Sequence, residues 1–518
     1  MRIDQLPQWP AFCDATKKAQ PNVNEVRLIE AAGLSVDLST QRSSTPFQAE
    51  AASILQNLGF DAARRALFDG EPINRSEQRP ALHTALRGSP APAAITETVA
   101  KALDRMAKFV EQTNAANRYQ NVVHLGIGGS DWGPRMVWQA LRGIGTRREL
   151  RFAANIDSHA ISSALAGLDP QDTLLVIASK SFTTLESITN AQYALNWMQQ
   201  GGVSNPLDHT VALTANPDAA LAFGIAPERT FAFWDWVGGR YSVWSSIGLT
   251  LALGLGWQCF ADLLAGARDM DTHFLTAPPK DNAPVQMALS SVANTSVLGF
   301  QSEVICPYDA RLTDFVPWLQ QLQMESLGKG VTQTGESVAI NISPATWGMP
   351  GSDSQHTFFQ WLHQGQTGAP VDFVACLSPE RPHGKHHRQL FGNCLAQRAA
   401  LWQGKTEAQA LAELTAKGME SEQARRLAKH CVHPGKRPST LIVLPTLDAA
   451  RLGALLALYE HKVFTTALLW GINAFDQWGV EFGKSLARQL LAEDQTVLGG
   501  FDASTQRWML ALKRANET

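Results

Sequence analysis

The chain has 518 residues, a formal net charge of -3 and a hydrophobic fraction of 45%. This length exceeds what one hydrophobic core usually supports, so we expect two domains with appendages. The weak net charge excludes a global basic field that would hold nucleic acid or an anionic membrane, whereas a few local donors can still bind a small anionic substrate.

Residues 1–117 are predicted to be mainly helical, with helices such as Phe47–Asn57 and Thr98–Gln112. Beyond them, short apolar runs rich in β-branched residues alternate with helical periodicity, which is typical of βα units in a parallel sheet. The first series has a helix at Leu185–Gln200 and strands at Asn121–Leu125, Thr173–Ala178 and Thr210–Leu213.

A second βα series follows a helical connector over residues 260–300. Its predicted strands are Glu303–Cys306, Val338–Ile342, Val371–Leu377 and Thr440–Val443, and its helices are Thr313–Leu327, Ser354–Gln364 and His387–Gln403. Helical segments at Leu486–Leu491 and Gln506–Arg514 form a tail. The pattern predicts an α/β protein with two open, mainly parallel sheets, related to each other as tandem folds.

The cysteines are scattered and form no CxxC pair, which is typical of a reducing compartment. The N-terminus lacks the basic and apolar regions of a signal peptide. The apolar stretch 452–469 is interrupted by Glu460, His461 and Lys462, and the stretch 247–255 by glycines, so neither predicts a membrane span of ~18 residues. We therefore expect a cytoplasmic protein with neither a membrane nor a nucleic acid as partner.

In open parallel sheets, ligands bind beyond the carboxyl ends of the strands, so the loops after the predicted strands are the candidate sites. The loop Gly126–Asp131 begins like a dinucleotide fingerprint, but Asp131 occupies the third glycine position. Its glycines let the backbone approach a ligand closely, and Ser130 adds a hydroxyl. A plain tight turn between strand and helix explains the same residues equally well.

The next loop, Ser179–Ser187, places several hydroxyls and Lys180 at a predicted helix N-terminus. Free backbone N–H groups, the helix dipole and hydroxyl donors together make a phosphate site. Thr183 and Glu186 are also spaced as a capping box, so a purely structural cap is the alternative. Because a cap uses fewer hydroxyls than this loop contains, phosphate binding is favoured.

Two further residues have the chemistry of a proton-transfer site. Arg240 follows two glycines and can present fixed donors to a developing oxyanion, although pairing with Asp235 is an equal alternative. Glu325 lies on the otherwise apolar helix Thr313–Leu327, where partial desolvation would strengthen it as a general base. The alternative is an ordinary solvated glutamate.

His356 and Lys484 are candidates only as members of a set. His356 follows the turn Trp347–Gly351, and Lys484 ends a segment that mixes aromatic and charged residues. Taken alone, the first is a structural histidine and the second a surface lysine.

Two long segments carry a family resemblance. Residues Asp235–Gly248 resemble one signature of the glucose-6-phosphate isomerase (phosphoglucose isomerase) family, and Gly471–Lys484 resemble the other. The segments Ser-Lys-Ser-Phe-Thr-Thr and Met-Glu-Ser occur in the family order. The resemblance runs from about Gly126 to Lys484.

The resemblance implies two sugar-isomerase-type (SIS) domains in a homodimer, with active sites at the subunit interface. The implied division is a helical N-terminal region at 1–117, a first SIS domain at 118–275, a second at 276–484 and a helical tail at 485–518. It implies the reversible interconversion of glucose 6-phosphate and fructose 6-phosphate through a cis-enediolate, in glycolysis and gluconeogenesis, with no cofactor and no metal.

Site residues carry over by position. The resemblance implies that Glu325 moves the proton between C2 and C1 and that Arg240 stabilises the enediolate. His356, reached from the partner subunit, and Lys484 would assist ring opening. The implied substrate-binding residues are Gly129, Ser130, Ser179, Lys180 through its backbone, Ser181, Thr184 and Gln477.

The sequence departs from the family pattern in places. Leu327 stands where asparagine is usual after Met-Glu-Ser, and Met349 replaces a carboxylate before His356. Ser181 and Ser187 stand where threonine is common, and serine keeps the hydroxyl.

Three other functions remain open at this point. A related isomerase would also act on mannose 6-phosphate, and a sensing module would bind the sugar phosphate without turnover. A dinucleotide oxidoreductase is the weakest of the three because the glycine fingerprint fails.

Overall fold

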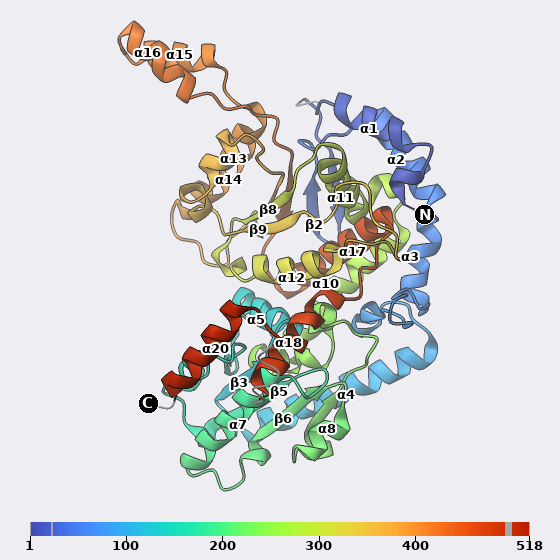
Figure 1. Cartoon of the computed structure of the whole chain (residues 1–518), viewed down its shortest axis with the longest axis vertical. Helices are drawn as coiled ribbons and strands as arrows, with labels where there is room; N and C mark the ends of the chain where they lie inside the picture. Colours follow the sequence, from blue (N-terminus) through green and yellow to red (C-terminus); the bar gives the residue numbers. More distant parts are fainter. Residues whose placement is uncertain (1, 22–23, 144, 493–499, 517–518) are drawn as a thin grey trace. The chain divides into compact units, whose positions relative to one another are not determined.

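The computed structural model describes residues 2–21, 24–143, 145–492 and 500–516, and its strands form two sheets (Figure 1). The first sheet is parallel, with the order β4-β3-β5-β6-β7. Its strands are β3 Asn121–Gly126, β4 Glu149–Phe152, β5 Thr173–Ala178, β6 Thr210–Thr214 and β7 Thr230–Ala232. Every residue of β5 is buried, as expected for a parallel strand with helices on both faces of its sheet.

The second sheet has the order β1-β2-β11-β10-β8-β9. Four of its strands are parallel, and the N-terminal hairpin adds two more through an antiparallel pairing of β2 with β11. The strands are β1 Leu28–Ala31, β2 Leu34–Asp37, β8 Ser302–Pro307, β9 Ala345–Gly348, β10 Val371–Cys376 and β11 Ser439–Leu444.

Both sheets repeat one connectivity. Strand β3 pairs with β4 and β5, and β8 pairs with β9 and β10, so in each half the first strand lies between the next two. The chain direction across the sheet therefore reverses at β3/β5 and again at β8/β10, the switch points where open α/β sheets bind ligands. The predicted α/β class with two open, mainly parallel sheets is confirmed. The domain limits stay a prediction, which the repeat supports.

Helices connect the strands and cover the sheets (Figure 1). In the first half they are α5 Gly129–Leu141, α6 Ser158–Leu165, α7 Leu185–Gln200 and α8 Pro217–Ala222. In the second half they are α12 Phe315–Leu327, α13 Phe359–Gln364, α14 His386–Gln403, α15 Glu407–Ala416 and α16 Ser421–His430. The remaining α-helices up to Ala474 are α1 Trp9–Lys18, α2 Thr45–Asn57, α3 Phe60–Asp69, α4 Ala93–Ala116, α9 Leu249–Leu255, α10 Trp257–Thr276, α11 Ala283–Val292 and α17 Ala449–Trp470.

Residues Phe475–Thr518 form a separate unit. It contains α18 Glu481–Leu491 and α20 Ala503–Asn516, which agree with the two predicted tail helices. Residues 493–499 and 517–518 of the predicted tail lie outside the described residues.

Two sequence predictions about local structure are wrong. Val338–Ile342 is not a strand, because its residues are exposed or half-buried in a loop, and β9 forms later in the chain. The predicted helix Ser354–Gln364 is divided into the short 3-10 helix η11 (Asp353–His356) and α13.

The hairpin β1–β2 was not predicted in the mainly helical first region. Its two-residue turn, Ala32–Gly33, has φ of 50° and 76°, the left-handed values of a type I′ hairpin turn. Strand β2 then pairs with β11, which lies some four hundred residues later in the chain, through partners such as Asp37 and Leu441.

Helix α17 is buried along most of its length, including three consecutive polar residues. Glu460, His461 and Lys462 are no more than 2% exposed. The Lys462 ammonium donates to Glu303 on β8 (2.6 Å) and to Asp372 on β10 (3.2 Å), so α17 is joined to two central strands. In the described part of the chain, no helix is long and apolar enough to cross a bilayer.

Glu460 and His461 of α17 belong to a buried cluster around Arg87 and Asp271. Arg87 binds Asp271 of α10 through two hydrogen bonds (2.6 and 2.7 Å) and Glu460 through a third (2.6 Å). His461 lies 2.6 Å from the same Asp271 carboxylate. Burial alone would raise the pKa of Asp271, but Arg87 and His461 lower it to about 2. Each buried charge thus has an opposite partner, which a stable interior requires.

Helices α10 and α17 approach so closely that glycine is required at the crossing. A Cβ atom on Gly453 would lie 2.0 Å from the Leu263 carbonyl oxygen. A Cβ atom on Gly266 would lie 1.7 Å from the Ala450 carbonyl oxygen. Any larger side chain would force the two helices apart.

Beneath the first switch point, the buried His124 of β3 holds the following loop. Its Nε2 lies 2.6 Å from the Ser130 carbonyl oxygen, to which it must donate, and its Nδ1 lies 2.8 Å from the Thr250 hydroxyl. This arrangement fits a neutral imidazole. Burial lowers the pKa of His124 to about 4.

We expect Gly453→Ala to destabilise the protein by about 1–3 kcal/mol or more, because the added methyl group overpacks the α10–α17 crossing. Gly392 lies in the exposed part of α14 with open space around it and is the matched control. Gly392→Ala should stabilise the helix by ~0.5–1 kcal/mol. Chemical unfolding of both variants measures the difference, and equal stabilities would contradict the proposed crossing.

We also expect acid to weaken the fold through His124. The pKa of His124 is lower in the folded than in the unfolded state. Its contribution to the free energy of unfolding is therefore complete above the unfolded pKa near 6.5 and is lost as the pH falls toward 4. The total loss is about 3 kcal/mol. In His124→Gln, the unfolding free energy should therefore fall less between pH 6.5 and pH 4.5 than in the wild type. Replacing the exposed His159 by glutamine should leave the wild-type pH dependence unchanged.

Candidate functional site

The candidate site begins at the carboxyl ends of β3 and β5. The loop after β3 contains Gly129 and Ser130 in the first turn of α5, and the loop after β5 contains Ser179–Thr184 before α7. Because β3 and β5 are neighbours at the switch point, the two loops lie at the same edge of the sheet. The N-termini of α5 and α7 therefore both lie at this edge, and helix N-termini favour the binding of an anion.

Hydroxyl groups hold the loop after β5 in shape. Ser179 Oγ lies 3.0 Å from Thr184 Oγ1 and accepts from the backbone N–H of Phe182 at 3.1 Å. Thr183 donates its hydroxyl to Ser181 Oγ at 2.8 Å. Phe182 has a φ of 56°, a left-handed value that is unusual for a bulky residue and is found at functional loops.

The capping box of Thr183 and Glu186, the alternative that their spacing left open, does not form. Helix α7 begins at Leu185, its N-cap residue is Thr184, and that side chain makes no capping hydrogen bond. The reason is that the Thr184 hydroxyl pairs with Ser179 and the Thr183 hydroxyl with Ser181. The loop hydroxyls thus shape the loop and leave the helix N-terminus uncapped by Thr184.

Lys180 connects this loop to the segment that precedes Arg240. Its ammonium donates to the backbone oxygens of Asp235 (2.8 Å) and Val237 (2.9 Å). Burial is the main reason that the pKa of Lys180 is lowered to about 8. The side chain therefore has a structural task, which agrees with the expectation that the Lys180 backbone, rather than its ammonium, contacts a ligand.

Two glycine-containing loops touch through their backbones. A Cβ atom on Gly129 would lie 2.1 Å from the carbonyl carbon of Gly239 and 2.7 Å from the backbone nitrogen of Arg240. Ser242 donates its hydroxyl to the Gly129 carbonyl oxygen at 3.1 Å. Glycine at position 129 is thus needed because another loop occupies the space of a side chain.

Arg240 and Glu325 form an ion pair at this site. Arg240 Nη1 lies 3.1 Å from Glu325 Oε2. The arginine is 3% exposed, and its Nε and Nη2 donate to Ser326 Oγ (2.7 Å) and the Ala474 carbonyl oxygen (2.6 Å). The Glu325 side chain is 28% exposed. In this arrangement the half-buried, accessible carboxylate can remove a proton from a ligand, and the fixed guanidinium can stabilise the negative charge that results.

Gln321 belongs to the same group and was not identified from the sequence. It lies one helical turn before Glu325 on α12 and donates its amide to Glu325 Oε1 at 3.1 Å. A Cβ atom on Gly128 would lie 3.3 Å from the Gln321 amide nitrogen. The spacing of four residues from a candidate base was the available signal.

Three predicted site residues do not contact the Arg240–Glu325 pair through any hydrogen bond described here. His356 lies at the end of η11 with an exposed side chain, and among the described residues the hydrogen-bond partners of the Glu325 carboxylate are Arg240 and Gln321. Gln477 and Lys484 belong to the second unit, where the Lys484 ammonium pairs with Glu481 at 2.8 Å.

Comparison with known proteins gives consistent results. A family model described as phosphoglucose isomerase matches residues 37–509. The glucose-6-phosphate isomerase of Bordetella avium is 54% identical over 510 residues, which cover 98% of each chain. Glucose-6-phosphate isomerase 1 of Thiobacillus denitrificans is 42% identical over 95% of this chain and 92% of its own.

A solved structure shows the same fold. The crystal structure of a glucose-6-phosphate isomerase from Chlamydia trachomatis superposes with a TM-score of 0.86, at 28% identity, over 99% of this chain and 100% of that chain. Together with the family match over most of the sequence, this similarity shows that the chain belongs to the phosphoglucose isomerase family.

Proposed function

We propose that the protein interconverts glucose 6-phosphate and fructose 6-phosphate by moving a proton between C2 and C1. The observation that carries this proposal is the Arg240–Glu325 pair, whose arginine follows the segment that Lys180 binds from the hydroxyl-rich loop Ser179–Thr184. A proton α to a carbonyl needs a positioned carboxylate as base and a positive group near the enediolate oxygens. The family membership supports the same reaction.

The substrate phosphate binds at the first switch point. Ser130, Ser179, Ser181 and Thr184 offer hydroxyls, while Gly129 and Lys180 offer backbone N–H groups beside the uncapped N-terminus of α7. Helix N-termini and hydroxyl donors favour a phosphate dianion. This placement directs the sugar carbons toward Glu325.

Glu325 takes the proton from C2 of the open-chain aldose and returns it to C1 on the same face of the cis-enediolate. Gln321 fixes one carboxylate oxygen, and Arg240 stabilises the negative charge on the enediolate oxygens. Since Arg240 supplies this positive charge, we expect activity without a metal or cofactor. Leu327, the departure next to this site, is buried at the end of α12 and leaves both groups in place.

Ring opening and sugar contact are assigned to residues outside this pair. His356 and Lys484 move the proton between the ring oxygen and the C1 hydroxyl, and Gln477 contacts the sugar. The exposure of His356 supports a role in the partner subunit's site, so we propose a homodimer with shared active sites.

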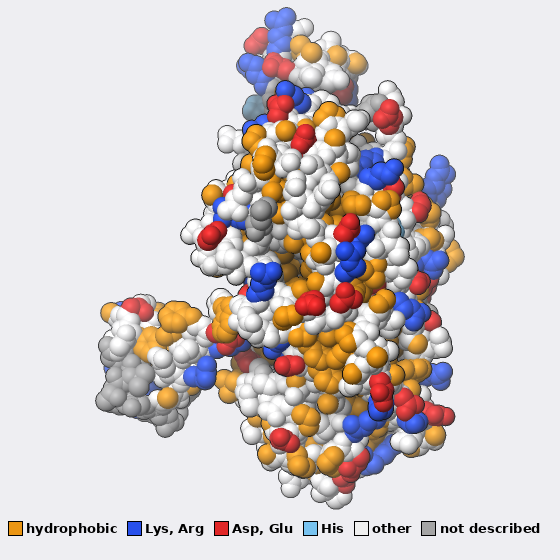
Figure 2. Space-filling model, turned by 90° about the vertical axis from the view of Figure 1, so that its right-hand side faces the viewer, with side chains coloured by type: hydrophobic (Ala, Val, Ile, Leu, Met, Phe, Trp, Pro, Cys, Tyr) orange, Lys and Arg blue, Asp and Glu red, His pale blue; other side chains and the backbone are white. Residues whose placement is uncertain are grey.

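We place the enzyme in the cytoplasm, in glycolysis and gluconeogenesis. The face drawn in Figure 2 supports a small-molecule partner, because Lys and Arg side chains are interspersed there with Asp and Glu. Side activity on mannose 6-phosphate is an open alternative, which product analysis distinguishes.

We expect Glu325→Gln to lower kcat by at least ~10²–10⁴-fold with little change in KM, because a general base is lost while phosphate contacts remain. The assay follows glucose 6-phosphate formation from fructose 6-phosphate with EDTA present. Glu336→Gln, at an exposed glutamate, is the matched control and should keep wild-type activity. A wild-type protein that binds the sugar phosphate without turnover would instead support the sensing module.

A mixture of two inactive variants tests the shared site. In a mixed dimer of Glu325→Gln and His356→Gln subunits, one site carries both changes and the other carries neither. Random exchange of subunits should thus restore about one quarter of wild-type activity. No recovery in mixed dimers that light scattering confirms would show that His356 acts within its own subunit, and a monomer would rule out the homodimer.

A further inference from the structure

The second sheet has a switch point of its own, for which the proposed reaction gives no role. The loops after β8 and β10 leave the sheet at neighbouring strands, as the loops after β3 and β5 do in the first half. A cavity of about 930 Å³ lies there, lined by Tyr308–Arg311 from the first loop and by Pro379–Arg381 from the second. This volume is typical of small-molecule sites.

The lining of this cavity has a positive excess. Three guanidinium groups face two carboxylates, so one positive charge is left over (three minus two). Arg311 uses both carboxylates, with bonds of 2.7 Å to Asp309 and 2.7 Å to Glu380. The other two arginines, Arg142 and Arg381, are thus the groups available to an anion.

Those two arginines come from different halves of the fold. Arg142 follows the last residue of α5, and in the described part of the chain its guanidinium forms no ion pair within 4 Å, while its charge acts at longer range on the Asp314 carboxyl. Arg381 is 72% exposed and lies 3.7 Å from Glu380, so that contact is weak. A Cβ atom on Gly143 would lie 3.3 Å from Arg381 Nη2, which brings the end of α5 against the loop after β10.

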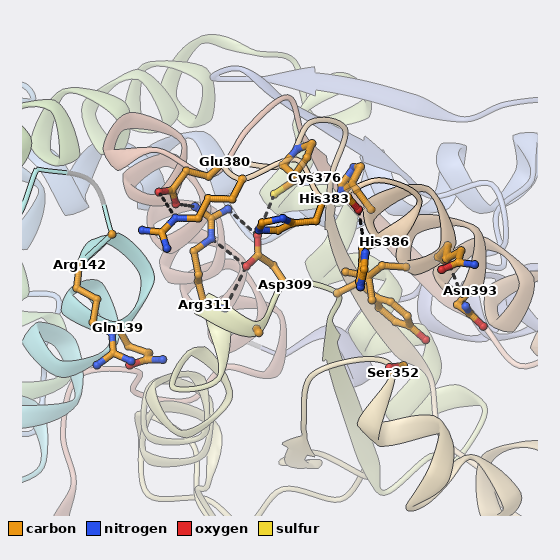
Figure 3. Close-up of a pocket in the computed structure, with 18 residues that line it drawn as sticks. Gln139, Arg142, Asp309, Arg311, Ser352, Cys376, Glu380, His383, His386 and Asn393 are labelled. Carbon is orange, nitrogen blue, oxygen red and sulfur yellow. Dashed lines mark hydrogen bonds and ion pairs between the residues drawn. The ribbon is translucent and has the colours of Figure 1, made fainter.

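Neutral donors complete the lining. Figure 3 shows Gln139 and Arg142 on one side of the cavity and His386, Asn393 and Ser352 on the other. His386 lies at the first turn of α14, whose N-terminus is a natural anion site. Its Nδ1 donates to the His383 carbonyl oxygen at 2.8 Å, so Nε2 of the neutral ring is an acceptor, and the neutral donors of the lining are the amides of Gln139 and Asn393 and the Ser352 hydroxyl.

We propose that this cavity is a second anion site, which binds the phosphate group of a small phosphorylated metabolite between Arg142 and Arg381. Arginine forks match phosphate oxygens in geometry and charge. The volume accommodates a sugar-sized body next to that phosphate, against Tyr308 and Leu390. This site is separate from the Arg240–Glu325 pair and does not depend on the isomerase proposal.

The test is a calorimetric titration of the full chain with inorganic pyrophosphate. No sugar phosphate is added, because a sugar phosphate would also be a ligand of the proposed cavity. We expect the wild type to bind pyrophosphate in this cavity, besides any that binds at the first site. The double variant Arg142→Gln/Arg381→Gln should bind pyrophosphate in the cavity at least about tenfold more weakly for each arginine that contacts phosphate.

Arg388→Gln removes a positive charge from an exposed position of α14 that does not line the cavity, so it should bind pyrophosphate as the wild type does. All variants should keep wild-type isomerase activity, which shows that they fold. The proposal is overturned if the wild type binds no pyrophosphate, if the double variant binds it with the same stoichiometry and affinity as the wild type, or if Arg388→Gln loses binding equally.

Discussion

The buried charges of α17 fix the positions of the elements that pack around this helix. Glu460, His461 and Lys462 lie in the interior, where unpaired charges are costly, so the surrounding elements must supply partners. Arg87, Asp271, Glu303 and Asp372 do so from four different parts of the fold. Removing one partner of such a group typically costs ~3–5 kcal/mol, so these elements are fixed around α17.

This network extends to the candidate site. Trp244 donates its indole N–H to Glu460 at 2.8 Å, and Trp244 ends the short helix η6 (Gly239–Trp244) that carries Arg240. The Arg87 guanidinium also lies over the Trp244 ring, 4.9 Å from its centroid. The buried charges therefore hold the segment from which Arg240 reaches Glu325.

The site itself is a product of close backbone contact. Gly129 and Gly239 touch without side chains between them, Lys180 uses its ammonium to hold carbonyl oxygens, and Phe182 adopts a left-handed φ. Such features cost stability locally and persist only where surrounding packing fixes them. The two halves of the fold use the same connectivity with different chemistry, since the first switch point has glycines and hydroxyls and the second has arginines.

The amino-acid sequence alone is enough to recognise the βα rhythm, the positions of strands such as β5 and the family signatures. These properties are local, because a buried parallel strand reads as a short apolar run and a signature is a run of residues. The sequence also identified Glu325 and Arg240 as candidates, through residue type and setting.

Which residues meet depends on how the whole chain folds. The ion pair of Arg240 with Glu325, the bond from Gln321, the pairing of β2 with β11 and the burial of Glu460 join segments or faces that no local pattern connects. Val338–Ile342 has the composition of a strand but lacks a neighbour that would complete its hydrogen bonds. Periodicity reports which face of an element prefers the interior, whereas the partner of that face depends on distant parts of the chain.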